Sequence, residues 1–179
     1  MSMPLNPIGP QNHGNIRRTQ NQDRLNKRLF EVLMQTPSES ATEALITLLE
    51  RGVNVNAMGN RGWTPLYLAV YTNDSEAVEL LINNGADVNI INDNGRTPLH
   101  LAALMGYGGI TKFLLDKGAK TNIKDRDGMT PLDWAELHKN EESKYWIRKY
   151  VNGEEQSRLI VSSSLDSIRR KVLEVDDDS

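Results

Sequence analysis

The 179-residue chain contains no cysteine, only three histidines and only two phenylalanines. The lack of cysteine excludes disulfide bonds and thiolate-based metal or catalytic sites. No apolar stretch approaches the roughly 20 residues that a membrane-spanning helix needs, and no secretory signal is present. The net charge of −3 predicts no general attraction to nucleic acid. We therefore expect an intracellular protein, cytoplasmic or nuclear, without a membrane or a direct nucleic-acid partner.

What the chain does contain is a repeat with a period of 33 residues. Three stretches of the form Gly-x-Thr-Pro-Leu begin at Gly62, Gly95 and Gly128. The same spacing relates three leucines, three further glycines and three asparagines: Leu48, Leu81 and Leu114; Gly52, Gly85 and Gly118; and Asn56, Asn89 and Asn122. A fixed period of this length predicts stacked structural repeats.

The middle copy predicts two helices and a loop. Thr97 can cap a helix N-terminus, and Pro98 suits the first helical position because its missing N–H has no intrahelical partner there. We expect that helix to end at Gly106 and a second one to run over about 109–117, with Gly118 as its left-handed C-terminal residue. The turn-forming residues that follow predict a hairpin-like finger loop before the next helix pair.

This unit resembles the ankyrin repeat through a run of seven motif residues, Thr97, Pro98, Leu99, His100, Leu101, Ala102 and Ala103. The resemblance covers roughly residues 23–153. It implies an all-α fold, a solenoid of stacked helix-turn-helix units with finger loops and helical caps. Because no such unit can bury its own apolar face, stability must come from each unit packing on the next.

The domain organisation follows from where the repeat holds. We predict a disordered N-terminal arm over residues 1–22, which are rich in Asn, Gln, Pro and Gly. The repeat domain should span 23–153, with a degenerate capping repeat at 23–56 and repeats at about 57–89, 90–122 and 123–153. Residues 154–179 form a tail with a short amphipathic helix at 164–175, which either packs back on the last repeat or binds a partner.

The sequence gives no indication of catalysis. No histidine has a cysteine or a paired carboxylate at metal-ligand spacing, and the glycine-rich run 106–109 lacks the Lys-Ser/Thr pair that follows a phosphate-binding loop. We predict no catalytic residue, no metal site and no cofactor, and therefore no enzyme. The family resemblance implies that His100 forms hydrogen bonds that link neighbouring repeats. Tyr67 and Asp133 occupy its position in the flanking copies, so the same links are not expected there.

The candidate binding residues are carried over from the family, in which finger tips and inner helices on the concave face usually contact a partner. Transferring those positions selects Met58, Arg61, Trp63, Tyr71, Ile91, Arg96, Leu104, Met105, Lys124, Arg126 and Met129. Trp63, Arg96 and Met129 are equivalent by the repeat and should form a row. Exposed Trp, Tyr, Met and Arg are enriched at the energetic centres of protein interfaces. The basic residues in the set indicate an acidic or phosphorylated partner segment.

Two functions stay open at this point. The first is a non-enzymatic interaction module or adaptor that presents its concave face to another protein. The second is a regulatory or targeting subunit that acts through its terminal segments, a role compatible with a bacterial or viral effector delivered into a host cell. In both cases we expect a monomer whose partner is another protein.

Overall fold

The computed structural model describes residues 13–153, with side-chain burial from residue 19 onward. Helices and turns make up this part of the chain, which contains no strand. The all-α prediction is therefore confirmed. The described residues divide into two compact units: residues 13–60 with 64–86, and residues 61–63 with 87–153.

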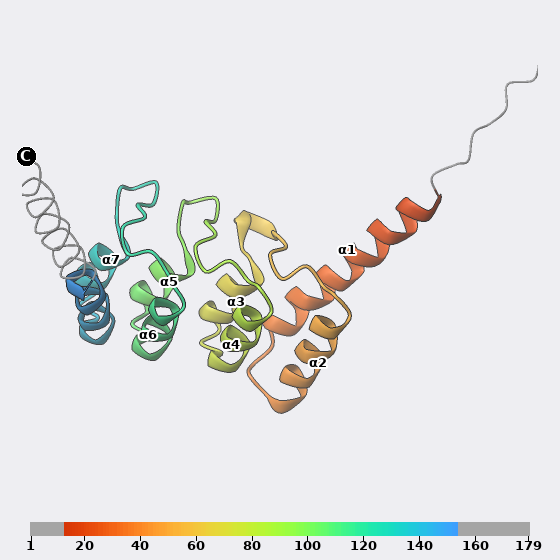
Figure 1. The fold of residues 1–179 in the computed structure, drawn as a ribbon, viewed down its shortest axis with the longest axis horizontal. Coiled ribbons are helices and arrows are strands. Elements are labelled where there is room, and N and C mark those ends of the chain that lie inside the picture. The colour runs from red at the N-terminus through yellow and green to blue at the C-terminus, as the bar shows by residue number, and fades with distance from the viewer. Residues whose placement is uncertain (1–12, 154–179) are drawn as a thin grey trace, which may run out of the picture. The chain divides into compact units, whose positions relative to one another are not determined.

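The first unit consists of two helix pairs, α1 (His13–Leu33) with α2 (Glu39–Glu50) and α3 (Pro65–Tyr71) with α4 (Ser75–Asn83). α1 packs against α2 and α3, and α4 packs against α2 and α3, so the pairs stack as two layers (Figure 1). One leucine from each helix is completely or almost completely buried between these layers: Leu29, Leu45, Leu66 and Leu81. The unit is held together by this apolar contact between pairs.

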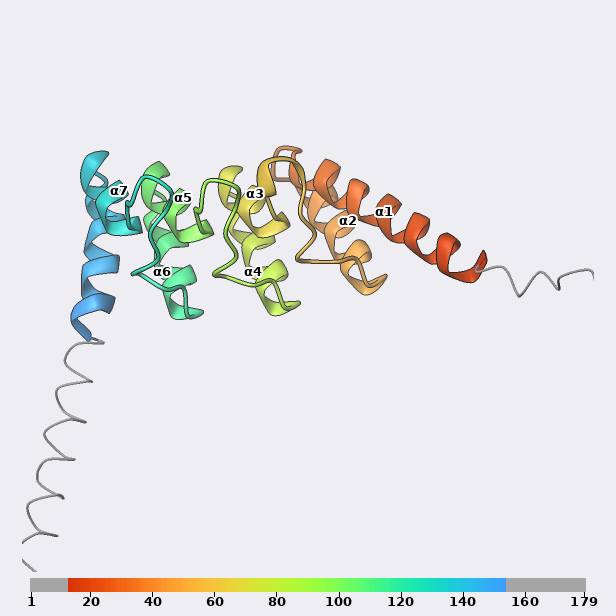
Figure 2. The same cartoon turned by 90° about the horizontal axis from the view of Figure 1, so that it is seen from above.

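The second unit repeats the arrangement with α5 (Pro98–Met105), α6 (Gly108–Asp116), α7 (Pro131–Leu137) and a helical segment over residues 141–153. α5 packs against both α6 and α7, as the two views show (Figures 1 and 2). Leu99, Leu114 and Ile147 have no exposed surface. Ile147 lies 33 residues after Leu114, so the period of the core extends into the last helix.

The predicted helix boundaries are found at the Thr-Pro motifs. Thr64, Thr97 and Thr130 are N-cap residues, and each hydroxyl oxygen accepts the backbone N–H of the third residue after it, at 3.2–3.3 Å. Gly106 ends α5 in the left-handed conformation, with φ +75°. The helices of the second unit therefore start and stop where capping chemistry predicts.

The recurring asparagines connect consecutive repeats. In the first unit the Asn56 side-chain amide donates to the Gly85 carbonyl at 3.1 Å. In the second, the Asn89 amide donates to the Gly118 carbonyl at 3.2 Å and its oxygen accepts the Lys120 N–H at 2.8 Å. Asparagine and glycine recur together in the sequence because one binds the backbone of the other in the next repeat.

Part of the predicted disordered arm is helical. α1 begins at His13, so residues 13–22 belong to a helix that was expected to start near residue 23. No proline or glycine occurs between Asn15 and Leu33, and a helix anchored by packing at its C-terminal end propagates through such a stretch at little cost. The first 12 residues of the predicted arm, and the tail at 154–179 with its helix at 164–175, lie outside the described residues.

The finger loops approach one another so closely that Gly62 has no room for a side chain. Its φ is +68°, and a Cβ atom would lie 2.8 Å from the backbone nitrogen of Asp93. Gly128 has a similar φ of +76°, but a Cβ there would have no heavy atom within 4 Å. We expect Gly128→Ala to cost about 1–2 kcal/mol of unfolding free energy through backbone conformation alone. Gly62→Ala should cost roughly 1–3 kcal/mol more, through the added clash.

Urea unfolding of both variants measures this difference directly. Equal losses of stability would show that the close approach of the loops contributes nothing.

Candidate functional site

Two finger loops of the second unit are built on the same side-chain support. The second finger (residues 90–96) contains Asn92 and the third finger (residues 123–129) contains Asp125, at equivalent positions of the repeat. Both side chains are buried, and one oxygen of each accepts the backbone N–H groups two and four residues later, at 2.9–3.0 Å. These bonds fix the loop backbones, so the finger tips are held by their own sequence.

The first finger (residues 57–63) lacks this support because Gly59 occupies the equivalent position. It forms the 3₁₀ turn η1 (Asn60–Gly62) instead, in which Arg61 takes a left-handed conformation with φ +62°. Two backbone bonds then join successive fingers in the same way: the Asp93 N–H donates to the Arg61 carbonyl at 3.1 Å, and the Arg126 N–H donates to the Asn94 carbonyl at 3.0 Å.

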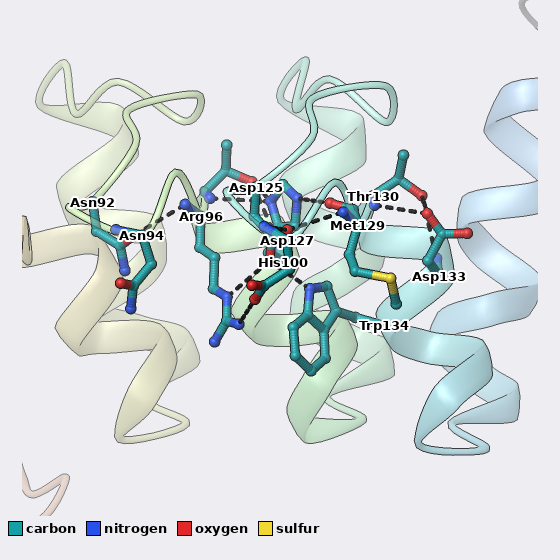
Figure 3. Close-up of polar contacts among 11 residues, drawn as sticks. Asn92, Asn94, Arg96, His100, Asp125, Asp127, Met129, Thr130, Asp133 and Trp134 are labelled. Atoms are coloured by element: carbon teal, nitrogen blue, oxygen red, sulfur yellow. Dashed lines mark hydrogen bonds and ion pairs between the residues drawn. The ribbon is translucent and has the colours of Figure 1, made fainter.

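Asp125 is the centre of a polar network at the base of the fingers (Figure 3). Its second carboxylate oxygen accepts hydrogen bonds from Arg96 Nε at 3.0 Å and from the indole Nε1 of Trp134 at 2.9 Å. The guanidinium of Arg96 also lies over the Trp134 ring, 4.3 Å from its centroid, and binds the exposed carboxylate of Asp127 at 3.2 Å. Burial raises the pKa of Asp125, but hydrogen bonds from the Met129 backbone, Trp134 and Arg96 outweigh it and hold that pKa below its usual range.

This network assigns Arg96 an intramolecular role. Its side chain is 21% exposed and contacts the second and third fingers and α7 at once. Sequence reasoning placed Arg96 among the partner-binding residues and did not select Asp125 or Trp134. The available signal was the equivalence of Asn92 and Asp125 by the 33-residue period, which marks both as loop-forming residues.

His100 links α5 to the third finger, as the family resemblance implied. It is buried, and its Nδ1 accepts the Thr97 backbone N–H at 3.1 Å, which leaves the ring proton on Nε2. Nε2 then donates to the Met129 carbonyl at 3.2 Å. Burial lowers the pKa of His100 more than the Met129 carbonyl and the charge of Asp125 raise it.

Asp133 takes the histidine position on α7 and does something different. Its carboxylate accepts the Thr130 hydroxyl at 2.7 Å and the Thr130 N–H at 2.8 Å, so it completes a capping box within its own repeat. These two bonds lower the pKa of Asp133. The change from His100 to Asp133 therefore replaces a bond between repeats by a local one.

Most of the predicted binding residues lie at the surface. Seven are exposed: Met58, Arg61, Tyr71, Ile91, Met105, Lys124 and Arg126. Trp63, Arg96, Leu104 and Met129 are half-buried. Met58 and Tyr71 belong to the first unit and the other nine to the second. Within residues 13–153, Arg61, Lys124 and Arg126 form no ion pair, so their charges are available for a partner.

The described part of the chain contains no helix long and apolar enough to cross a membrane. The same residues include no cluster of three or more acidic or histidine side chains that could hold a metal ion.

Comparison with known proteins agrees with the repeat architecture. A family model described as ankyrin repeats (3 copies) matches residues 33–125 and 88–151. The chain therefore belongs to the ankyrin-repeat family. Its members are generally protein–protein interaction modules and are typically not enzymes. No curated protein sequence matches the chain.

The Asp125 network should be a major source of stability in the second unit. In Asp125→Asn, the new amide would face N–H donors on all sides, because every group bound to this carboxylate is a donor. We expect a loss of about 3 kcal/mol in unfolding free energy, in the range for breaking a buried charge pair. Asp127→Asn removes an exposed partner of the same arginine and should cost less than about 1 kcal/mol. Chemical denaturation of both variants would contradict the network's importance if the two losses were alike.

His100 should make stability depend on pH in a defined direction. Because its pKa is lower in the folded state than in the unfolded chain, the unfolded chain binds more protons between the two values. Its contribution is therefore complete above about pH 6.5, the unfolded value, and is lost as the pH falls below it. Asp125 and Asp133 have lowered pKa values and act only below about pH 4.

Thermal melting at pH 7.5 and pH 5.5 should show a larger drop for the native chain than for His100→Asn. A drop of the same size in both would assign the pH dependence to other groups.

Proposed function

We propose that this chain is a non-enzymatic protein-binding module whose partner contacts the fingers of the second unit and the C-terminal ends of α5 and α7. The observation that carries the proposal is an apolar edge on these two adjacent helices. Met105 is 43% exposed and Leu137 is 62% exposed, and half-buried Leu104 lies at the position of Leu137 one repeat earlier. α5 and α7 pack side by side, so these side chains belong to one surface.

Polar and apolar contacts are both offered within one unit. Ile91, 50% exposed, adds an apolar side chain on the second finger, and the cations of Arg61, Lys124 and Arg126 lie on the first and third fingers. The finger tips precede α7 and the apolar edge follows it. This seven-residue helix separates them by roughly 10 Å. A mixed surface with apolar anchors and basic side chains at its margin fits a partner segment that carries both apolar and acidic residues.

The rigidity of the fingers supports binding rather than catalysis. The side chains with strongly directed hydrogen bonds, namely Asn92, Asp125, His100 and Asp133, all act on the protein's own backbone or on neighbouring side chains. Loops that are ordered before binding lose little conformational entropy in the complex, which favours affinity. The function of this framework is therefore to hold exposed side chains in place.

Quantitative affinity capture tests the proposal with the full chain as bait. Met105→Ser/Leu137→Ser removes the apolar edge, and Arg61→Gln/Lys124→Gln/Arg126→Gln removes the finger cations. Removal of interface anchors typically costs 2 kcal/mol or more, so we expect at least about tenfold lower capture of a specific protein. Arg96 stays unchanged because its substitution would disturb the Asp125 network.

The matched control is Met34→Ser/Ile46→Ser, which changes two apolar side chains of the first unit that are 57% and 40% exposed. Its capture should equal that of the native chain. If both test variants retain every captured protein, the second-unit surface is not the binding site.

A further inference from the structure

α1 is longer than its packing requires. It has 21 residues, whereas its partner α2 has 12. Its buried residues, Leu25, Leu29, Val32 and Leu33, all lie in the C-terminal nine positions, and none of residues 19–24 is buried. Both views show the N-terminal half of α1 running past the end of α2 (Figures 1 and 2). The projecting part contributes little to the core of the first unit.

This helix carries a charge opposite to that of the rest of the chain. Residues 13–28 contain five basic residues and one acidic residue, a net charge of +4, so the remainder of the chain carries −7. Arg24 and Lys27 are exposed and form no ion pair within residues 13–153, while Arg28 pairs only with the exposed Glu31 at 3.1 Å. The basic charge of α1 is therefore not neutralised by the described protein.

The neutral residues of the exposed face are amides rather than apolar side chains. Gln20 and Asn21 are exposed beside Arg24, and no exposed residue among 19–28 is apolar. A helix that docks into a protein groove needs apolar anchors at i, i+3, i+4 and i+7. Arginine and lysine that bind phosphates, together with amides that hydrogen-bond to base edges, are instead the residue types of a nucleic-acid contact.

We propose that the basic face of α1 binds the phosphate backbone of duplex DNA. An α-helix with side chains is about 10–12 Å across and fits the major groove of B-form DNA, which is about 12 Å wide, whereas the major groove of duplex RNA is too narrow. The chain's net negative charge does not prevent this contact, because charges farther away than about 10 Å are screened at moderate salt. This activity is separate from the proposed protein-binding surface of the second unit.

The test is the fluorescence anisotropy of a labelled 24-base-pair DNA duplex titrated with the full chain at several salt concentrations. The variant Arg24→Gln/Lys27→Gln/Arg28→Gln removes three described cations. The control Lys117→Gln/Lys120→Gln/Lys139→Gln removes the same charge from exposed positions of the second unit. Circular dichroism confirms that helix content is unchanged in both variants.

We expect the native chain to bind weakly, with an affinity that falls steeply as salt rises. The α1 variant should bind roughly tenfold or more weakly at low salt, with a shallower salt dependence, because each lost phosphate contact removes about 0.9 from the slope of log K against log salt. The control should bind like the native chain, since its changes lie away from α1.

Further arms with a duplex RNA, a single strand and polyglutamate identify the ligand. Equal or tighter binding of any of them would overturn the assignment to duplex DNA, and polyglutamate binding would indicate an acidic protein instead. Absence of salt-dependent binding, or equal weakening in both variants, would also overturn the proposal. None of these results affects the capture experiment, because α1 is unchanged there.

Discussion

The buried carboxylate of Asp125 is the interaction on which the second unit most depends. Four N–H groups from two fingers and α7 converge on its two oxygens, and the charge of Arg96 compensates its own. A buried anion is stable only when it is hydrogen-bonded and paired in this way. The position of the third finger, the start of α7 and the orientation of Arg96 therefore all follow from one side chain.

The separation of framework from surface is a consequence of this arrangement. Polar groups with strongly directional bonding, such as His100 and Asp133, bind the chain's own backbone, and the described side chains leave no buried polar atom without a partner. What remains exposed on the fingers and inner helices is a mixture of cations and apolar side chains. Because the framework is satisfied internally, these exposed residues can change without loss of the fold, and partner choice lies in them.

The distribution of charge gives the chain a second possible surface of a different kind. Fingers and inner helices offer apolar anchors with isolated cations, whereas α1 offers a row of cations and amides without apolar anchors. Apolar burial depends little on salt, but contacts between exposed charges are screened by it. Binding at the two surfaces should therefore respond differently to ionic strength, which allows them to be distinguished in the intact protein.

The sequence by itself determined the repeat and its helices, because capping and turn chemistry are local. Thr97 with Pro98 starts a helix and Gly106 ends it whatever surrounds them, and the 33-residue period requires stacking. The roles of single side chains depended on residues about 30 positions away. Arg96 looked like an exposed interface residue until the fold brought Asp125, Asp127 and Trp134 around it. The extent of α1 was also decided by packing, since Leu25 and Leu29 anchor a helix that composition alone assigned to disorder.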